Sequence, residues 1–271
     1  NQLTGINFEG GCELNLLFSN FFRKNGLHAL TVLNNKWNNS EIGNYWDNYT
    51  GIDANEDGVG DKPHNISTSP LIQDFLPIVD NLSPEINVVS PYNNSIHGAT
   101  APSFNLSISE KYIDETWYSL DGGVTNISFT GLTETFDQAK WEDSDDGKVL
   151  IRFYASDKAG NEGFSEIQIE KDSIAPIITI NQPVFEEVFD DSPPMYNISV
   201  DELHLYVFWY SLDDGINNYT GTGLVSMINQ TLWDGLQDGE LTLHFYAKDE
   251  VGNYGESSVL IIKRTSQIEQ S

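Results

Sequence analysis

The sequence predicts an all-β protein whose C-terminal part consists of two antiparallel β-sandwiches in tandem. The first observation behind this prediction is an internal repeat, because the segment Trp117–Asp121 returns as Trp209–Asp213, 92 residues later. The same offset relates further Pro, Asn, Trp and Gly residues without a gap, and a fixed period of this kind defines a repeated structural unit. The second observation is the alternation of apolar and polar residues in each copy, and the third is the Gly, Asn and Asp turns between the alternating segments.

Composition restricts the partners of the chain. With 271 residues the chain is long enough for two or three domains, and its formal charge is −28 at pH 7. That charge argues against nucleic acid or an anionic membrane as a partner, since both attract clustered Lys and Arg. It is compatible with an extracellular protein or with divalent cations, and equally with a solvated acidic surface. The single cysteine, Cys12, cannot form an intrachain disulfide and is expected to be a small buried residue.

Neither a membrane span nor a leader is visible in the sequence. Spanning a bilayer takes an apolar run of about 20 residues, and the chain has none. The first residue is Asn1 rather than Met, and no signal-like segment follows it. We therefore expect a processed product or a fragment.

Residues 1–50 differ from the rest of the chain. Short apolar runs alternate there with Asn-bearing turns such as Asn25–Gly26. Short strands of this kind favour the rungs of a parallel β-helix, in which each rung stacks its apolar residues on the next and Asn side chains form ladders at the corners.

Three segments in this region, at 18–26, 34–37 and 43–51, look like the closing rungs of right-handed β-helix proteins. The similar families are periplasmic copper-site-maturation proteins and carbohydrate-binding or sugar-hydrolase β-helices, and the resemblance covers about the first 80 residues. It implies a parallel β-helix of which only about two rungs are present, although about three stacked units are needed for a stable core. We therefore expect upstream rungs or a neighbouring subunit to cover the open end. A copper role is not supported, because the five histidines are scattered.

The loop that follows has the pattern of a calcium site. Oxygen ligands at loop positions 1, 3 and 5, a Gly at position 6, a carbonyl at 7 and an acid at 9 are typical of Ca²⁺ loops. Here the predicted ligands are Asp53, Asn55, Asp57, Val59 and Asp61. Position 12 is His64 rather than an acid, so the loop is not an EF-hand, and its Ca²⁺ would be structural. The alternative is an acidic Asx-turn loop without metal.

The loop and a Pro-punctuated connector together occupy residues 51–83, where the segment 71–76 is predicted to pack back on the β-helix end. The first sandwich is expected over residues 84–173, the second over 174–265, and a tail over 266–271.

Each repeat contains matched alternating strands. Phe104, Leu106 and Ile108 are expected to face the core, while the intervening Asn105 faces out, as Asn197 does in the second copy. About seven short strands per copy indicate a β-sandwich, and Trp117 and Trp209 are the candidate core tryptophans.

The two copies also resemble bacterial and archaeal immunoglobulin-like surface domains. The segments that carry this resemblance, 154–161 and 246–253, follow the pattern Tyr-Ala-x-Asp-x-x-Gly-Asn. Asp157 and Asp249 in these segments are candidates to bind Ca²⁺ with acids near the linker, such as Asp172. The alternative is that they are surface acids or form Asx turns.

Glycosylation sequons of the Asn-x-Ser/Thr type are more frequent than the about three or four that chance would give. They begin at Asn38, Asn48, Asn65, Asn81, Asn93, Asn105, Asn126, Asn197, Asn218 and Asn229. This density favours an extracellular glycoprotein, and a composition rich in Asn and Ser is the alternative.

The sequence contains no phosphate loop, nucleophile elbow or Cys pair, so we expect no enzymatic activity from these residues. We expect an extracellular structural or adhesive protein of archaeal type, acting as a filament subunit, surface-layer component or stalk. Its expected partners are further copies of itself, through the open β-helix edge, or other surface proteins. One alternative is a fragment of a polysaccharide-binding or polysaccharide-cleaving β-helix protein with sandwich spacers. Another is a lectin-like sandwich that uses tyrosines near Tyr118 and Tyr210.

Overall fold

The computed structural model describes residues 4–8, 14–24, 27–30, 35–68 and 71–265. Cys12, the turn at Asn25–Gly26 and the tail 266–271 lie outside the described residues. Internal contacts divide the chain into two compact units. The first unit holds Asn1–Tyr92, Ser103–Glu134 and Leu150–Ile167, and the second holds Asn93–Pro102, Thr135–Val149 and Gln168–Ser271.

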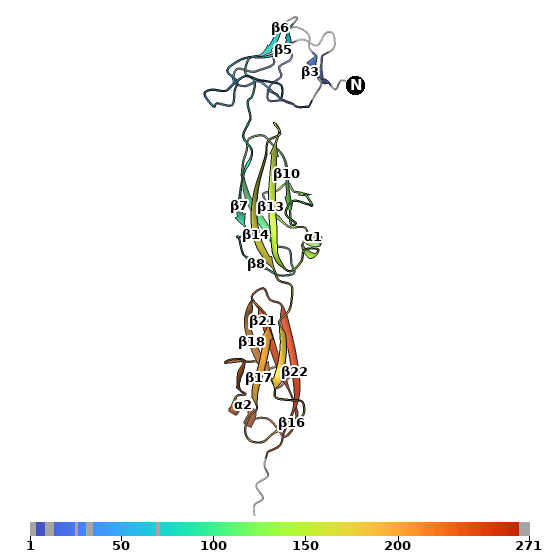
Figure 1. The fold of residues 1–271 in the computed structure, drawn as a ribbon, viewed down its shortest axis with the longest axis vertical. Helices are drawn as coiled ribbons and strands as arrows, with labels where there is room; N and C mark the ends of the chain where they lie inside the picture. Colours follow the sequence, from blue (N-terminus) through green and yellow to red (C-terminus); the bar gives the residue numbers. More distant parts are fainter. Residues whose placement is uncertain (1–3, 9–13, 25–26, 31–34, 69–70, 266–271) are drawn as a thin grey trace, which may run out of the picture. The chain divides into compact units, whose positions relative to one another are not determined.

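The regular secondary structure of the described residues is almost entirely β-strand, as the sequence predicts (Figure 1). The strands before the repeats are β1 (Thr4–Asn7), β2 (Phe21–Phe22), β3 (Leu27–Leu30), β4 (Tyr45–Trp46), β5 (His64–Thr68) and β6 (Leu71–Asp74). The first repeat contains β7 (Glu85–Ser90), β8 (Ile96–His97), β9 (Ser103–Ser109), β10 (Ile113–Ser119), β11 (Ile127–Ser128), β12 (Thr133–Thr135), α1 (Gln138–Glu142), β13 (Gly147–Asp157) and β14 (Glu162–Lys171). The second repeat contains β15 (Ile177–Gln182), β16 (Glu187–Phe189), β17 (Met195–Asp201), β18 (Leu205–Ser211), β19 (Tyr219–Thr220), β20 (Val225–Met227), α2 (Gln230–Asp234), β21 (Gly239–Asp249) and β22 (Tyr254–Lys263).

The short N-terminal strands pair in parallel. β1 pairs with β3, and β2 pairs with β4. Asn side chains bond between the stacked segments, since the Asn20 amide donates to Asn44 at 2.8 Å and the Asn15 amide donates to Asn35 at 2.9 Å. The predicted Asn ladder is therefore present, and the assignment of these strands to a parallel β-helix stays a prediction.

A small aromatic core holds this N-terminal region together. The Trp46 ring stacks on Phe22 at 4.3 Å and on His64 at 4.8 Å. The buried Asp74 carboxylate, at the end of β6, accepts a hydrogen bond from the Trp46 indole at 3.0 Å. Since Ile72 of β6 lies in the same buried cluster, the segment 71–76 packs back on the N-terminal strands, as predicted.

Each repeat forms a three-stranded and a five-stranded sheet. In the first repeat the strand orders are β12-β9-β7 and β11-β10-β13-β14-β8. In the second they are β15-β17-β20 and β16-β22-β21-β18-β19. The long strands at the centre of each larger sheet are antiparallel, with Tyr118 opposite Phe153 in the first repeat and Tyr210 opposite Phe245 in the second. Two such sheets per repeat form a β-sandwich.

The predicted alternation of core residues is confirmed in both copies. Phe104 and Leu106 are buried, and Asn105 between them is only half-buried. The predicted core tryptophans are wrong, however. Trp117 and Trp209 lie on the outer face, because each precedes a buried tyrosine in its strand and neighbouring strand residues point to opposite faces.

The tryptophans that are fully buried in the repeats lie instead on the two short helices, which the sequence patterns did not indicate. Trp141 of α1 and Trp233 of α2 are both 0% exposed. Beneath Trp233, the buried Lys263 ammonium donates to the carbonyls of Trp233 and Leu236 at 2.8 and 2.7 Å. A cation at the last carbonyls of a helix satisfies backbone acceptors that have no partner within the helix.

Candidate metal centres

The described residues gather three carboxylates at two places, and the two places correspond. The first acid triad is Asp80, Glu110 and Asp157, and the second is Asp172, Glu202 and Asp249. In each triad one oxygen per residue lies within 4.8 Å of the others. Each member of the second triad follows its counterpart by 92 residues.

Each triad combines acids from separate parts of the fold. Asp80 lies in the connector before the first repeat, Glu110 lies between β9 and β10, and Asp157 ends β13. Turns at one end of the sandwich therefore meet the segment that enters it. Glu110 is held in place by the Tyr112 backbone N–H, which donates to its carboxylate at 2.6 Å.

The buried member of each triad organises its own turn. One oxygen of Asp157 accepts from the N–H groups of Gly160 and Asn161 at 2.6 and 2.9 Å. The Asn161 amide then donates to the other Asp157 oxygen at 2.8 Å and to the backbone carbonyl of Asp80 at 3.0 Å. The Asx turn that the sequence offered as an alternative is therefore present, and it binds the connector as well.

The second triad repeats this arrangement. Asp249 accepts from the N–H groups of Gly252 and Asn253 at 2.6 and 2.8 Å, and the Asn253 amide donates to the carbonyl of Asp172 at 2.9 Å. Glu202 accepts from the His204 N–H at 2.8 Å.

Crowded acids raise the proton affinity at both centres. Burial, followed by the charges of Asp157 and Glu110, raises the pKa of Asp80 to about 6. Burial, together with Glu202 and Asp249, also raises the pKa of Asp172. One Asp80 oxygen is buried and has no hydrogen-bond partner among the described residues, and no Lys or Arg of that part of the chain pairs with any acid of the two triads. An ionised cluster of this kind lacks a positive partner.

The predicted calcium loop at 53–61 is arranged by its own hydrogen bonds. Asp53 accepts from the N–H groups of Asp57 and Gly58 at 3.2 and 2.8 Å, and Asp61 accepts from Ala54 at 2.9 Å. Its three carboxylates do not form a triad of the kind described above. Asn55 donates to Asp57, and Val59 also donates to Asp57. Calcium binding by this loop stays a prediction.

The predicted glycosylation sites are all accessible to some degree. Asn38, Asn105 and Asn197 are half-buried, and the other seven sequon asparagines are exposed. Asn229 has a structural role too, because its side chain caps α2 by accepting from the Leu232 N–H, as Asp137 caps α1.

Sequence reasoning named Asp157, Asp249 and Asp172 as possible ligands and missed Asp80, Glu110 and Glu202. The repeat itself carried the missing signal. Between Asp80 and Asp157, six acids recur as acids 92 positions later, and three of these six pairs form the triads.

No protein-family model and no curated protein sequence matches the chain. Among solved structures, it is similar to the fibronectin(III)-like modules of Clostridium thermocellum CbhA, with 13% identity, 69% of this chain and 98% of that chain covered, and a TM-score of 0.35. It is also similar to a 1.5-MDa bacterial ice-binding adhesin (11% identity, 69% and 67% covered, TM-score 0.42). Drosophila N-cadherin EC1-4 is a third similar structure (13% identity, 72% and 52% covered, TM-score 0.34). The strand pairing described above makes the two repeats tandem β-sandwiches.

None of the helices among the described residues has the length and apolar character that a membrane crossing requires.

Proposed function

We propose that the chain is an extracellular structural or adhesive segment in which Ca²⁺ fixes the connector before each sandwich to that sandwich. The observation that carries this proposal is the recurrence of the acid triad. Three carboxylates meet at the same three positions of both repeats, one from the connector and two from turns.

Calcium suits this donor set better than zinc or copper does. Ca²⁺ prefers about six to eight oxygen ligands in flexible geometry, whereas zinc and copper prefer His and Cys. All six residues of the triads are carboxylates. A bound cation would neutralise their repulsion and link three segments that are far apart in sequence.

The proposal has a direct test in cation binding by the full chain. The variants Glu110→Gln and Glu202→Gln each remove one charge from a triad and keep an oxygen for the backbone bond of that residue. We expect each variant to lower the Ca²⁺-induced rise in melting temperature, and the double variant to abolish most of it. Glu115→Gln, at an exposed position of β10, is the control. Equal Ca²⁺ responses in all variants would refute the triads as calcium sites.

The N-terminal region supports an assembly role for the same protein. We infer that residues 1–50 are closing rungs of a parallel β-helix, and the support is the parallel pairing of β1 with β3 and of β2 with β4 together with the Asn ladder. A neighbouring subunit that stacks on the first rung would continue the ladder, and contacts of this kind that do not close produce filaments. Occupied sequons would place the assembly outside the cell.

Assembly is tested by light scattering and electron microscopy of the concentrated chain with Ca²⁺ and with chelator. Regular polymers are the expected result. A chain that stays monomeric in Ca²⁺ at high concentration would exclude self-assembly through this edge. Binding of polysaccharide by the N-terminal region would instead favour the alternative, a β-helix fragment of a carbohydrate-active protein with sandwich spacers.

A further inference from the structure

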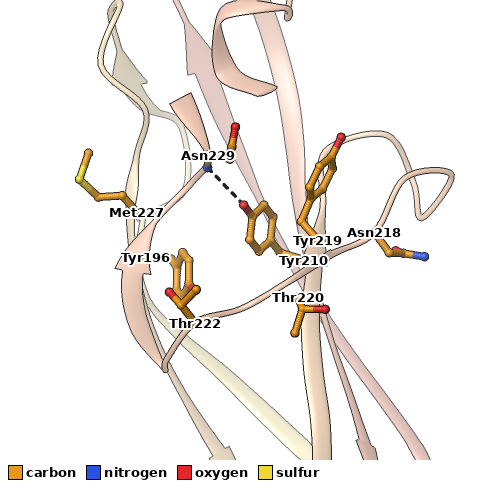
Figure 2. Close-up of a pocket in the computed structure, with 8 residues that line it drawn as sticks. All are labelled: Tyr196, Tyr210, Asn218, Tyr219, Thr220, Thr222, Met227 and Asn229. Atoms are coloured by element: carbon orange, nitrogen blue, oxygen red, sulfur yellow. Dashed lines mark hydrogen bonds between the residues drawn. The ribbon is translucent and has the colours of Figure 1, made fainter. Parts of the chain in front are cut away.

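The second repeat contains a polar pocket that the metal centres do not involve. Its volume is about 360 Å³, which lies within the range of ligand pockets, about 300–1,000 Å³. Figure 2 shows its lining, which includes three tyrosines from β17, β18 and β19 and two sequon asparagines: Tyr196, Tyr210, Tyr219, Asn218 and Asn229. Two threonines and Met227 complete the wall.

The first repeat fills the corresponding space with an aromatic ring. Phe129 is buried there, 5.2 Å from the Phe104 ring and 6.3 Å from the Tyr118 ring. Tyr196 and Tyr210 occupy the positions of those two partners in the second repeat, but the position of Phe129 is taken by Gly221. The second repeat therefore lacks the side chain that packs against these two walls.

A second substitution keeps the core of the second repeat intact. Thr116, the neighbour of Phe129 on the adjacent strand, is replaced by Phe208. The Phe208 ring lies over Gly221, so that a Cβ at Gly221 would collide with it. An aromatic ring that covers a glycine on the neighbouring strand compensates for the missing side chain. The aromatic ring is thus at the position of Phe129 in the first repeat and on the adjacent strand, at Phe208, in the second. The pocket lies beside Phe208 and Gly221.

The lining of the pocket has gained hydroxyl groups. Tyr196 stands where the first repeat has Phe104, and Tyr219 stands where it has Ile127. The Tyr219 ring stacks on Tyr210 at 5.6 Å. The Tyr210 hydroxyl accepts from the Asn229 N–H at 3.2 Å, so its own proton remains for a ligand oxygen.

The absence of charged groups from the lining indicates a neutral ligand. None of the lining residues is ionisable in the neutral range, although the chain contains 41 acidic residues. A second cavity of about 380 Å³ shares Tyr219 and Asn229 with the first, so the two cavities adjoin. Neutral hydroxyl and amide groups beside aromatic rings suit a ligand that has both hydroxyl groups and an apolar face.

We propose that this pocket of the second repeat binds a neutral saccharide. This inference goes beyond the proposed function, because it depends on neither the cation nor the N-terminal edge. The saccharide has two possible sources with the same chemistry. One is a glycan of another molecule, and the other is an N-linked glycan of this protein, since Asn218 and Asn229 begin sequons at the pocket.

The test is NMR titration of the unglycosylated full chain with neutral disaccharides, namely N,N′-diacetylchitobiose, cellobiose, maltose and lactose. We expect at least one of them to shift the signals of Tyr219 and Met227. Tyr196→Phe and Tyr219→Ile, which install the residues of the first repeat, should each weaken binding about 5- to 10-fold through loss of a hydrogen bond. Tyr154→Phe, on the outer face of the first repeat, is the matched control and should leave the affinity unchanged.

The double variant Phe208→Thr/Gly221→Phe restores the ring of the first repeat and should abolish binding. A melting curve establishes that it folds, and the two single tyrosine variants test the proposal if it does not. No signal shift with any of the four sugars, or unchanged affinity in the pocket variants, would overturn the proposal. Measurements in Ca²⁺ and in chelator separate this outcome from failure of the metal centres.

The source of the saccharide is distinguished with the native glycoprotein. Asn218→Gln and Asn229→Asp remove the two sequons, and Asp keeps the helix cap because Asp137 is the cap of α1. If the chain's own glycan occupies the pocket, added disaccharide binds only after these sequons are removed. If the ligand comes from another molecule, the native protein and the sequon variants bind it equally.

Discussion

Without calcium at the proposed sites, the stability of the protein should depend on pH in an unusual direction. Burial and two neighbouring acids raise the pKa of Asp80 from 3.8 to about 6. An acid whose pKa is raised by folding is protonated more readily in the folded state than in the unfolded state. Its stabilising contribution is complete below pH 4 and is lost as the pH rises through about 6. We therefore expect the calcium-free protein to be less stable at pH 8 than at pH 5.

The magnitude follows from the shift in pKa. A change from 3.8 to about 6 corresponds to at most about 3 kcal/mol, at 1.36 kcal/mol per pKa unit. Asp80 is partly exposed, and screening by water reduces this to about 1 kcal/mol. The raised pKa of Asp172 acts in the same direction in the second triad. A loss of about 1 kcal/mol lowers the melting temperature by about 2–4 °C in a protein of this size.

The assay is calorimetry at pH 5 and pH 8, with chelator and with Ca²⁺. Calcium should reverse the pH dependence, because it binds the ionised carboxylates and the protons compete with it. The variant Asp80→Asn controls for the general repulsion of a chain with a charge of −28, and it should lose the part of the pH dependence that the first triad causes. If the wild-type protein and Asp80→Asn show the same pH dependence, or if Ca²⁺ stabilises both equally, the reasoning is refuted.

Three further predictions concern buried groups. Lys263→Met removes the ammonium that caps α2 and should cost about 2–3 kcal/mol in urea unfolding, whereas an exposed Lys248→Met should change little. Asp74→Ala leaves the Asn44 and Trp46 donors without an acceptor and should cost about 3 kcal/mol, visible as a changed near-UV signal of Trp46. Gly255→Ala places a Cβ against the carbonyl oxygen of Pro176 and should make the connector more sensitive to protease, a result that unaltered cleavage would contradict.

The sequence predicted the repeat, the all-β class and the inward faces of the strands, because these depend on periodicity. Period-2 alternation places Phe104 and Leu106 in the core whatever the rest of the sheet does. The prediction of core tryptophans failed at Trp117 and Trp209. The size of these side chains suggested burial, although the alternation along each strand places Tyr118 and Tyr210 inside. Alternation was the better guide there, since a strand residue cannot change faces without a register shift.

The candidate metal centres were harder to predict because each one is assembled from three segments that are distant in sequence. Nothing in the neighbourhood of Glu110 distinguishes it from other turn acids, and its role depends on the approach of Asp80 and Asp157. The predicted calcium loop at 53–61 differs in this respect, since its sequence pattern is local and easy to recognise. Its carboxylates accept backbone N–H groups of the loop itself. Local patterns thus predict turns well, whereas sites that depend on tertiary contacts need a comparison between the two copies.

The comparison between copies also separates shared structure from specific function. The acids of the triads and the buried tryptophans occur in both repeats. So do the lysines at the helix ends, because Lys171 donates to the carbonyls of Glu142 and Ser144 as Lys263 donates to those of Trp233 and Leu236. Both sandwiches therefore have the same structural requirements at these positions. Phe208 and Gly221 differ from Thr116 and Phe129 as a pair, and one change without the other would leave a collision or an unfilled core. A coupled exchange of this kind keeps the fold while it changes the surface beside it. The pocket at Tyr219 is therefore the place where we propose a function specific to the second sandwich.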